Sequence, residues 1–334
     1  MEWINTLNTL CHAFGPSGAE GGVAQIIEEM AHPYVDEITR DTMGNLICRK
    51  KGSGPRLMFS AHMDSIGLVV THIDDKGFLR VGAIGGVHAD AVVNTPVRFQ
   101  NGTCGVIAAQ VGSTPGKRTM ADLYLDIGAA SREEAEQQVQ IGDVAVYNTP
   151  VFPAGALVAG PYMDNRISCL VLLQAMERLH DCPNDVYFVF STQEEVGLRG
   201  AKTAAWSIDP DYGIAVDVTS EDGIPGAKHT ASSLAGQGAA VKVMDRSVIC
   251  HPKMVNLLME LAQKQGIPAQ RDVIQAGGTD AGAIHQTRSG VCTGGISIPC
   301  RYTHTPCEMV CAADVEACVA LVAALAQTKL EKEC

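Results

Sequence analysis

The sequence lacks clustered positive charge. It contains no block of Lys and Arg residues, and 37 acidic against 25 basic residues give a formal net charge of -12. Proteins that bind the phosphate backbone of nucleic acids present a basic patch or stripe. We therefore do not expect a nucleic-acid partner.

The sequence also lacks segments that direct a chain into or across a membrane. Its start, "MEWINTLNTL", has neither the basic beginning nor the apolar core of a signal peptide. The longest apolar run near the C-terminus, "CVALVAALA", is far shorter than the roughly 20 residues that cross a bilayer. We expect a cytoplasmic protein with no membrane partner.

The 12 cysteines include no CxxC pair. Most lie within apolar runs, as Cys48, Cys169, Cys292 and Cys318 do. In a long chain this pattern favours buried, reduced thiols over a disulfide framework.

The order of helix and strand patterns predicts an α/β domain interrupted by a β-rich insertion. Before residue 67 and after residue 161, helices alternate with apolar strands, which is typical of a mostly parallel sheet with helices on both faces. Residues 68–160 instead contain short alternating strands separated by Gly, Pro and Asn, typical of a small β-barrel or sandwich. We predict a catalytic domain from residues 1–67 and 161–334, with residues 68–160 inserted in it.

Polar residues appear where three of the apolar strands stop. "LMFSAHMD" ends on His62 and Asp64, "YFVFSTQEE" on Glu194 and Glu195, and "YGIAVDVT" on Asp217. The carboxyl ends of strands in an open α/β sheet form its ligand-binding edge. A single Asp after a strand is more often a cap or turn residue, but three such strands together predict a site.

Two further residues extend this set. Asp164 in "PYMDNRIS" precedes a helix, where its ordinary role is an N-cap, and His304 in "CRYTHTPCE" lies in a loop, where a lone His is usually structural. With them the set offers His and carboxylate ligands, which suit Zn²⁺ or Co²⁺ and not an Fe–S or structural Cys₄ site. Cys300 and Cys307 flank His304, but the set does not need them as ligands.

The spacing of these residues suggests a separate role for each. His62 and Asp64 are two residues apart, so Asp64 can accept a hydrogen bond from the second imidazole nitrogen, unless the pair only stiffens the strand end. Of the adjacent glutamates, one can bind metal while the other takes the proton of a metal-bound water. A glycosidase pair is disfavoured because its two carboxyl groups must flank a sugar.

These motifs, in this order, resemble the cytosolic dinuclear metalloaminopeptidases that include the glutamyl, deblocking and tetrahedral (TET) aminopeptidases. The resemblance covers nearly the whole chain and rests on these segments: "GPSGAE", "NLI", "SAHMDSIG", "MDNR", "STQEEVGLRGA", "AVDVT", "GGTDAGAI" and "RYTHTPCE". It implies two divalent metal ions, Zn or Co, in each subunit, and a hydrolase that removes the N-terminal residue from peptides.

The resemblance also implies residue roles. One ion would bind His62, Asp164 and Asp217, and the other would bind Asp164, Glu195 and His304. Glu194 would be the general base, with Asp64 supporting His62 from behind. A cis peptide bond is expected between Asp164 and Asn165. The substrate pocket would lie near Gly278, Thr279 and Asp280.

Two positions depart from the pattern of many relatives. Asn165 stands where a second Asp is common, which leaves Asp164 as the bridging residue, and Thr305 stands where Ser is common.

Other functions stay open at the level of sequence. The same scaffold can carry a metal-dependent carboxypeptidase or an N-acyl deacylase, which would not require a free amine. A binding protein without metal is disfavoured because no ligand position is substituted, and a thiol enzyme because no Cys lies in a Cys-His motif.

The insertion has a separate expected role, since no proposed ligand lies in it: it pairs subunits. By resemblance, dimers would assemble into a tetrahedral dodecamer, whereas the simpler alternative is an open dimer. The pattern does not indicate the preferred N-terminal side chain or the choice between Zn and Co.

Overall fold

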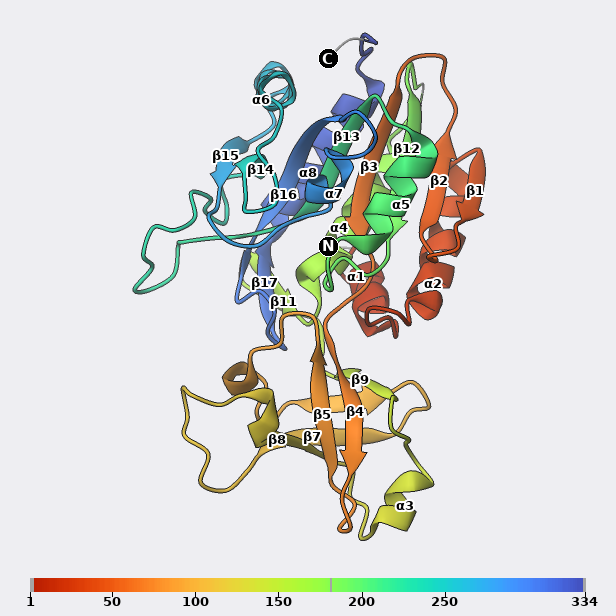
Figure 1. Cartoon of the computed structure of the whole chain (residues 1–334). Helices are drawn as coiled ribbons and strands as arrows, with labels where there is room; N and C mark the ends of the chain where they lie inside the picture. The colour runs from red at the N-terminus through yellow and green to blue at the C-terminus, as the bar shows by residue number, and fades with distance from the viewer. Residues whose placement is uncertain (1–2, 181, 333–334) are drawn as a thin grey trace.

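The computed structural model describes residues 3–180 and 182–332. Within these residues the chain forms an α/β part built on an eleven-stranded sheet and a separate closed β-barrel (Figure 1). The prediction of an α/β fold with an inserted β domain is confirmed, and the insertion is a barrel.

The barrel lies below the α/β part in Figure 1 and has its own apolar core. Its strands close in the order β4-β5-β8-β7-β6-β9. In chain order they are β4 (Gly67–Ile73), β5 (Leu79–Ile84), β6 (Pro96–Phe99), β7 (Cys104–Ala109), β8 (Leu123–Asp126) and β9 (Val144–Tyr147), with the short helix α3 (Arg132–Glu136) between the last two. The barrel strands therefore end before residue 160, because the two strands that follow β9 return to the large sheet.

The large sheet runs in the order β1-β2-β12-β3-β13-β16-β17-β11-β10, and β14 also pairs with β16 and with β15. Its strands are β1 (Glu37–Arg40), β2 (Leu46–Lys50), β3 (Arg56–His62), β10 (Phe152–Ala154), β11 (Leu157–Gly160), β12 (Asp185–Ser191), β13 (Tyr212–Ser220), β14 (Ala239–Met244), β15 (Ala269–Val273), β16 (Cys292–Arg301) and β17 (Glu308–Cys311).

The pairing of these strands corrects the expected mostly parallel sheet. The central strands β12, β3, β13 and β16 are parallel, but the strands on both flanks pair antiparallel. The sheet is therefore mixed, with a parallel centre. Short connections join the antiparallel pairs β1/β2, β10/β11 and β16/β17, whereas the antiparallel pairs β2/β12 and β11/β17 bring together strands that are far apart in the sequence.

Helices cover both faces of this sheet, as the sequence predicts. One face carries α1 (Trp3–His12), α2 (Gly21–Ala31), α4 (Met163–Glu177), α6 (Pro252–Gln265) and α8 (Ala312–Gln327). The other carries α5 (Arg199–Ile208) and α7 (Ala281–Ile284), which lie in front of the sheet in Figure 1. Because both faces are covered, β3 and β13 are buried along nearly their whole length and read as continuous apolar runs.

The central strand β16 does not read as a continuous apolar run. Its sequence "CTGGISIPCR" contains two glycines that a strand interior normally disfavours. A Cβ at Gly294 would lie 2.5 Å from Met254 Cγ, and one at Gly295 would lie 2.9 Å from Lys242 Cβ. The glycines are needed because α6 and β14 approach the strand closely.

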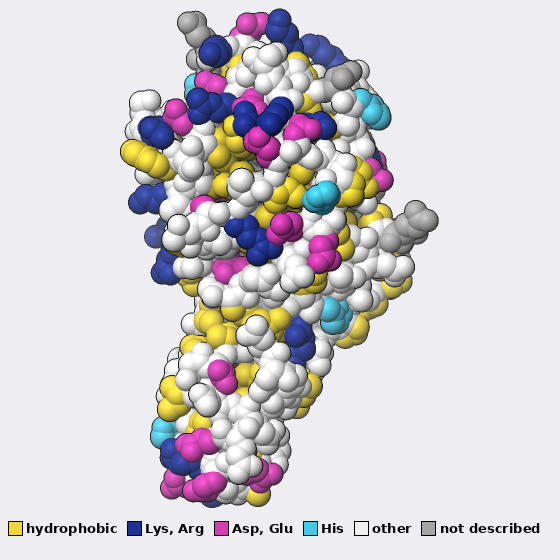
Figure 2. All heavy atoms as spheres, turned by 90° about the vertical axis from the view of Figure 1, so that its right-hand side faces the viewer, with side chains coloured by type: hydrophobic (Ala, Val, Ile, Leu, Met, Phe, Trp, Pro, Cys, Tyr) yellow, Lys and Arg dark blue, Asp and Glu magenta, His cyan; other side chains and the backbone are white. Residues whose placement is uncertain are grey.

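The surface and the cysteines agree in part with the expectations. On the face shown in Figure 2, Lys and Arg side chains are interspersed with Asp and Glu. In the part of the chain that the structure describes, no helix is long and apolar enough to cross a membrane. Cys48, Cys169 and Cys318 are free and buried, but Cys292 is disulfide-bonded, so the expectation of a reduced thiol there is wrong.

Candidate active site and metal centre

The register of the central strands brings the expected residues to one edge of the sheet. His62 ends β3 and is the partner of Ser191, the last residue of β12. β13 pairs with β3 as far as Ala215 and Ser60, so Asp217 lies two residues further along, level with His62. The ends of β3 and β12 therefore lie level with Asp217, which is inside β13, three residues before that strand ends at Ser220.

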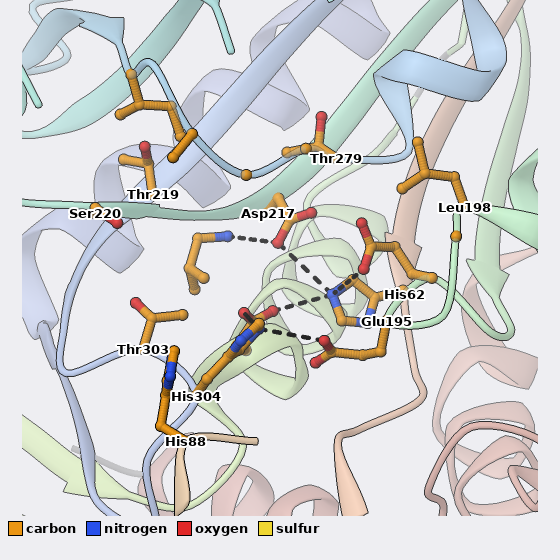
Figure 3. A pocket seen from close by; sticks show the side chains of 18 residues that line it. His62, His88, Glu195, Leu198, Asp217, Thr219, Ser220, Thr279, Thr303 and His304 are labelled. Atoms are coloured by element: carbon orange, nitrogen blue, oxygen red, sulfur yellow. Dashed lines mark hydrogen bonds and ion pairs between the residues drawn. The ribbon is translucent and has the colours of Figure 1, made fainter. Parts of the chain in front are cut away.

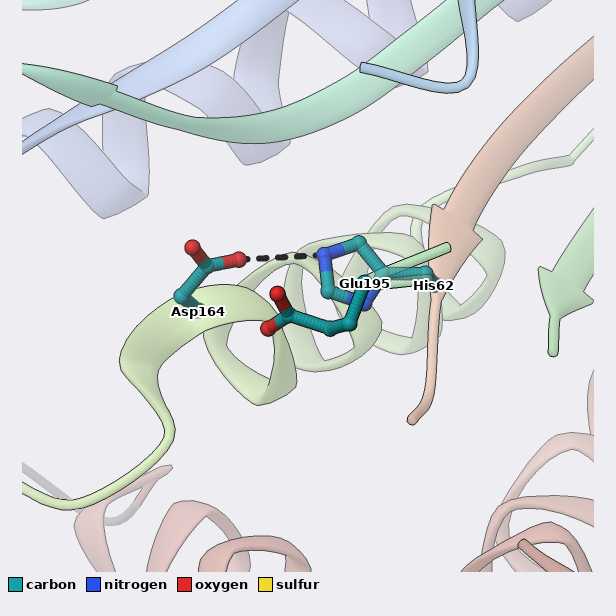
Figure 4. Close-up of side chains that lie close together, drawn as sticks. All are labelled: His62, Asp164 and Glu195. Atoms are coloured by element: carbon teal, nitrogen blue, oxygen red, sulfur yellow. Dashed lines mark hydrogen bonds and ion pairs between the residues drawn. The ribbon is translucent and has the colours of Figure 1, made fainter. Parts of the chain in front are cut away.

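Asp164 faces His62, as Figure 4 shows, and its other carboxylate oxygen faces His304. Its Oδ1 is 3.0 Å from His62 Nε2, and its Oδ2 is 3.3 Å from His304 Nε2. Each carboxylate oxygen thus contacts a different imidazole. This is the arrangement that a carboxylate bridging two cations requires.

The other expected ligands lie on either side of this bridge. Glu195 Oε2 is 3.2 Å from His304 Nε2, and Asp217 Oδ1 is 3.8 Å from His62 Nε2. One ligand atom from each of His62, Asp164 and Glu195 lies within 4.8 Å of the others, which groups them as a possible metal site.

The chemistry of the cluster fits divalent cations. Glu195 Oε1 is buried and has no hydrogen-bond partner among the described residues. Burial raises the pKa of Glu194 and of Asp217 well above the ordinary range, and neighbouring carboxylates add to it. Although burial lowers it, Asp164 and Glu195 raise the pKa of His304 to about 12. Buried carboxylates at this density need positive charge, which bound metal ions would supply.

The two glutamates lie in a tight turn after β12 and not on the strand itself. β12 ends at Ser191, and Gln193 has φ 53°, which turns the chain before Glu194. The backbone N–H groups of Gly197 and Leu198 both donate to the Glu194 carbonyl at 2.9 Å. Because the strand has ended, the alternation of side chains no longer applies. Both glutamates line the cavity over the cluster, and Figure 3 shows Glu195 beside His62.

Asp64 holds this turn against the strand that carries His62. Its carboxylate accepts hydrogen bonds from the backbone N–H of Glu194 (3.0 Å), the backbone N–H of Glu195 (3.2 Å) and the Ser17 hydroxyl (2.6 Å). Its contact with His62 is looser than predicted. The carboxylate is 3.5 Å from Nδ1, and the Asp64 main-chain carbonyl, at 3.2 Å, is the nearer partner.

Glu308 is a site residue that sequence reasoning missed. Its side chain is 2% exposed and accepts hydrogen bonds from the backbone N–H of Asp164 (2.9 Å) and of His304 (2.7 Å). It thereby fixes the main chain of two expected ligands. Its position four residues after His304 in "THTPCE" was the available signal.

The peptide bond between Asp164 and Asn165 is cis, as expected. Asn165 turns away from the cluster, since its Nδ2 donates to the Val216 carbonyl at 3.0 Å. The two cysteines beside His304 do not join the site. Cys307 is exposed, and burial raises the pKa of the Cys300 thiol well above its usual value.

A cavity of about 530 Å³ opens over the cluster (Figure 3). Gly278 and Thr279 line it, as expected of a substrate pocket. Asp280 does not: it is 1% exposed, and its Oδ2 accepts hydrogen bonds from Ser60 (2.6 Å) and Ser191 (2.5 Å). Asp280 therefore ties β3 to β12 beneath the site.

The barrel also contributes to the site, although no expected ligand lies in it. His88, which follows the barrel strand β5, lines the cavity. A Cβ at Gly85 would lie 3.1 Å from Glu195 Cβ, and one at Gly86 would lie 2.5 Å from His304 Nδ1. The loop after β5 packs directly against two of the expected ligands.

Comparisons with known proteins agree with this geometry. The family described as M42 glutamyl aminopeptidase matches residues 44–321. A protein of Acetivibrio thermocellus is 47% identical over 322 residues, covering 96% of this chain and 97% of its own length. The lysyl aminopeptidase of Pyrococcus furiosus is 37% identical over 340 residues, covering 97% of this chain and 96% of its own length.

A solved structure agrees over the whole fold. The Pyrococcus horikoshii TET1 peptidase, described as assembling into a tetrahedron or a large octahedral shell, superimposes with a TM-score of 0.87 at 32% identity, covering 97% of this chain and 98% of its own. Together with the strand-end cluster, these matches show that the chain is a peptidase of the M42 glutamyl aminopeptidase family.

Proposed function

We propose that the protein holds two divalent metal ions, Zn²⁺ or Co²⁺, and removes single residues from the free N-terminus of peptides. His62, Asp164 and Asp217 would hold one ion, and Asp164, Glu195 and His304 the other. The position of Asp164, with one oxygen toward each histidine, is the observation that carries this proposal. The unpartnered, buried Oε1 of Glu195 supports it.

Bound metal ions would supply Lewis acidity toward the scissile carbonyl and lower the pKa of a water molecule. The chain supplies the proton transfer. Glu194 lines the cavity, and its Oε2 is 3.8 Å from His62 Nε2, so it can take a proton on the cavity side of the cluster and return it to the leaving amine. The two N–H donors to Asp64 keep Glu194 in place while it does so.

A carboxypeptidase or an N-acyl deacylase on the same scaffold is the alternative. Two relatives whose descriptions name a peptide-cleaving activity, the lysyl aminopeptidase and the TET1 peptidase, favour exopeptidase action, and the former favours the N-terminal end.

The decisive test compares matched substrates with free and blocked amines. Alanyl and leucyl p-nitroanilides would be incubated with the metal-loaded protein beside their N-acetylated forms. We expect cleavage of the free-amine substrates alone, loss of activity after chelation, and recovery with added Zn²⁺ or Co²⁺. Preferential cleavage of the acetylated forms would favour the deacylase and contradict the aminopeptidase proposal.

We also propose that the protein assembles into a homo-oligomer. The barrel has short strands and stands apart from the α/β part, which suits a surface for pairing subunits (Figure 1). The TET1 relative assembles into a tetrahedron or an octahedral shell. A tetrahedron has six edges, so one dimer along each edge gives the dodecamer that we propose. We also propose a cytoplasmic location, which the free, buried thiols of Cys48, Cys169 and Cys318 support, since reduced thiols persist there.

A further inference from the structure

The residues that line the cavity indicate which substrate side chain it accepts, which the family description does not settle for this chain. Of the lining residues, the carboxylates, His62 and His304 belong to the cluster described above. The remaining wall consists of small or uncharged side chains and one further imidazole, His88. Its apolar members are Leu198, Val218, Ile274 and Ala276, and its hydroxyl members are Thr219, Ser220, Thr279 and Thr303.

No Lys or Arg of the described chain lines this cavity. Two buried or half-buried cations near this wall are already paired. Lys242 lies beneath the wall, where its Nζ donates to Thr219 Oγ1 at 3.4 Å, but it is fully buried and pairs with Asp272 at 2.6 Å. Arg301 pairs with the buried Glu221. Neither is free to meet an acidic substrate.

The field in the cavity is also unfavourable to an acidic side chain. Besides the carboxylates that line it, Asp64, Asp280 and Glu308 lie buried behind the cluster. Two divalent cations bring four positive charges, fewer than these carboxyl groups can carry together. A desolvated carboxylate without a partner is costly, and here it would also be repelled.

A lysyl side chain lacks a partner for a different reason. Every carboxylate that lines the cavity lies in the cluster, so none remains in the apolar part of the wall to receive an ammonium group. In Figure 3, Leu198 and Thr279 lie on the side of the cluster opposite to His88. Leu198 is anchored there by α7, since a Cβ at Gly282 would lie 3.0 Å from its Cδ1.

We propose that this wall selects uncharged aliphatic N-terminal residues such as Leu, Ile and Met, in contrast to the glutamyl specificity in the family's description. The inference rests on the proposed aminopeptidase function. Leu198, Val218 and Ile274 would contact the side chain, and the threonine hydroxyls would bind the peptide backbone.

The first test is a panel of leucyl, methionyl, glutamyl, aspartyl and lysyl p-nitroanilides with the metal-loaded protein. We expect kcat/KM for Leu or Met to exceed that for Glu or Asp at least about 100-fold, because an unpaired buried charge is costly. Lys should fall below Leu. Calorimetric titration with the free amino acids provides a readout without turnover, and leucine should bind more tightly than glutamate.

Charge added to the wall should reverse this preference in part. Ile274→Arg places a guanidinium in the cavity, and Ala276→Arg does so from an exposed position if the first variant folds poorly. Each should raise the Glu-to-Leu ratio of kcat/KM by about tenfold or more. Val273→Arg is the matched control, because Val273 is exposed, adjacent to Ile274 and outside the cavity lining.

The outcomes separate the two proposals. If Glu or Lys substrates are cleaved as well as Leu, or if Val273→Arg changes the ratio as much as Ile274→Arg, the assignment of the wall is wrong while the aminopeptidase proposal stands. If no free-amine substrate is cleaved, the aminopeptidase proposal fails, and the assignment of the wall then fails with it.

Discussion

Replacing Gly86 by Ala should weaken metal binding without altering any expected ligand. Gly86 follows β5 of the barrel, and an added Cβ would lie 2.5 Å from His304 Nδ1 and 2.8 Å from Cε1. Ordinary contacts of this kind begin at 3.4 Å, so the imidazole or the loop must move by close to 1 Å. His304 cannot move freely, because its backbone N–H donates to Glu308 at 2.7 Å.

The expected magnitude follows from what that movement breaks. His304 Nε2 lies 3.2 Å from Glu195 and 3.3 Å from Asp164, so a displaced ring leaves the position shared with both carboxylates. Disturbing a residue that supports a metal ligand typically costs about 10–100-fold in metal affinity. We expect a loss of that size for the ion held by His304 and little change for the ion held by His62.

Metal content after dialysis against graded chelator concentrations measures both affinities. Gly82→Ala is the control, since it adds the same methyl group to β5, where the nearest atoms are side-chain atoms of Thr71 and Val69 at an ordinary 3.4 Å. Thermal unfolding shows whether either variant disturbs the barrel. If Gly86→Ala binds both ions as tightly as Gly82→Ala, the barrel loop does not position His304 and the reasoning is refuted.

Further experiments test other parts of the site and the assembly. Glu194→Gln should keep both ions but lower the rate about 10²–10⁴-fold, as expected when a general base is lost, whereas Asp164→Ala should lose metal. Metal analysis and a peptidase assay check both variants, and near-full activity of Glu194→Gln would exclude Glu194 as the base. Glu308→Gln should loosen the loop around His304 and lower metal affinity, although every expected ligand is unchanged. Chelator competition measures this affinity, and a wild-type value would contradict the supporting role of Glu308. Light scattering on the metal-loaded protein should give the mass of a dodecamer, and the mass of a single chain would refute the assembly proposal.

The strand-end residues were predictable because their signals are local. An apolar run that stops on His or Asp marks the end of a buried strand, and parallel strands bring such ends together whatever the details of the sheet. His62 and Asp217 needed only this rule; His62 does end β3, whereas β13 continues past Asp217 to Ser220. Asp164 and His304 lie outside strands, where each has an ordinary alternative role, and only the resemblance to a family gave them specific roles in the site.

The parts that were missed depend on contacts between distant segments. Gly294 and Gly295 make β16 look like a turn, and only the close approach of α6 and β14 explains them as strand residues. Gly86 is an ordinary loop glycine until His304 lies against it. The mixed character of the sheet likewise follows from flanking strands whose partners are far away in the sequence, which local patterns do not encode.

Asp64 does not line the cavity, yet the two adjacent glutamates depend on it. Glu194 and Glu195 have different expected tasks, so each must be held at a fixed position relative to His62 and to the other. Asp64 does this by accepting both of their backbone N–H groups while remaining next to His62 in the chain. Ser17 adds a third donor to the same carboxylate. Although burial raises it, His62 and, after it, Ser17 and the Glu194 N–H hold the pKa of Asp64 below its usual range. By accepting these backbone N–H groups, Asp64 gives the general base and the metal ligand a common reference point two residues beyond His62, the last residue of β3.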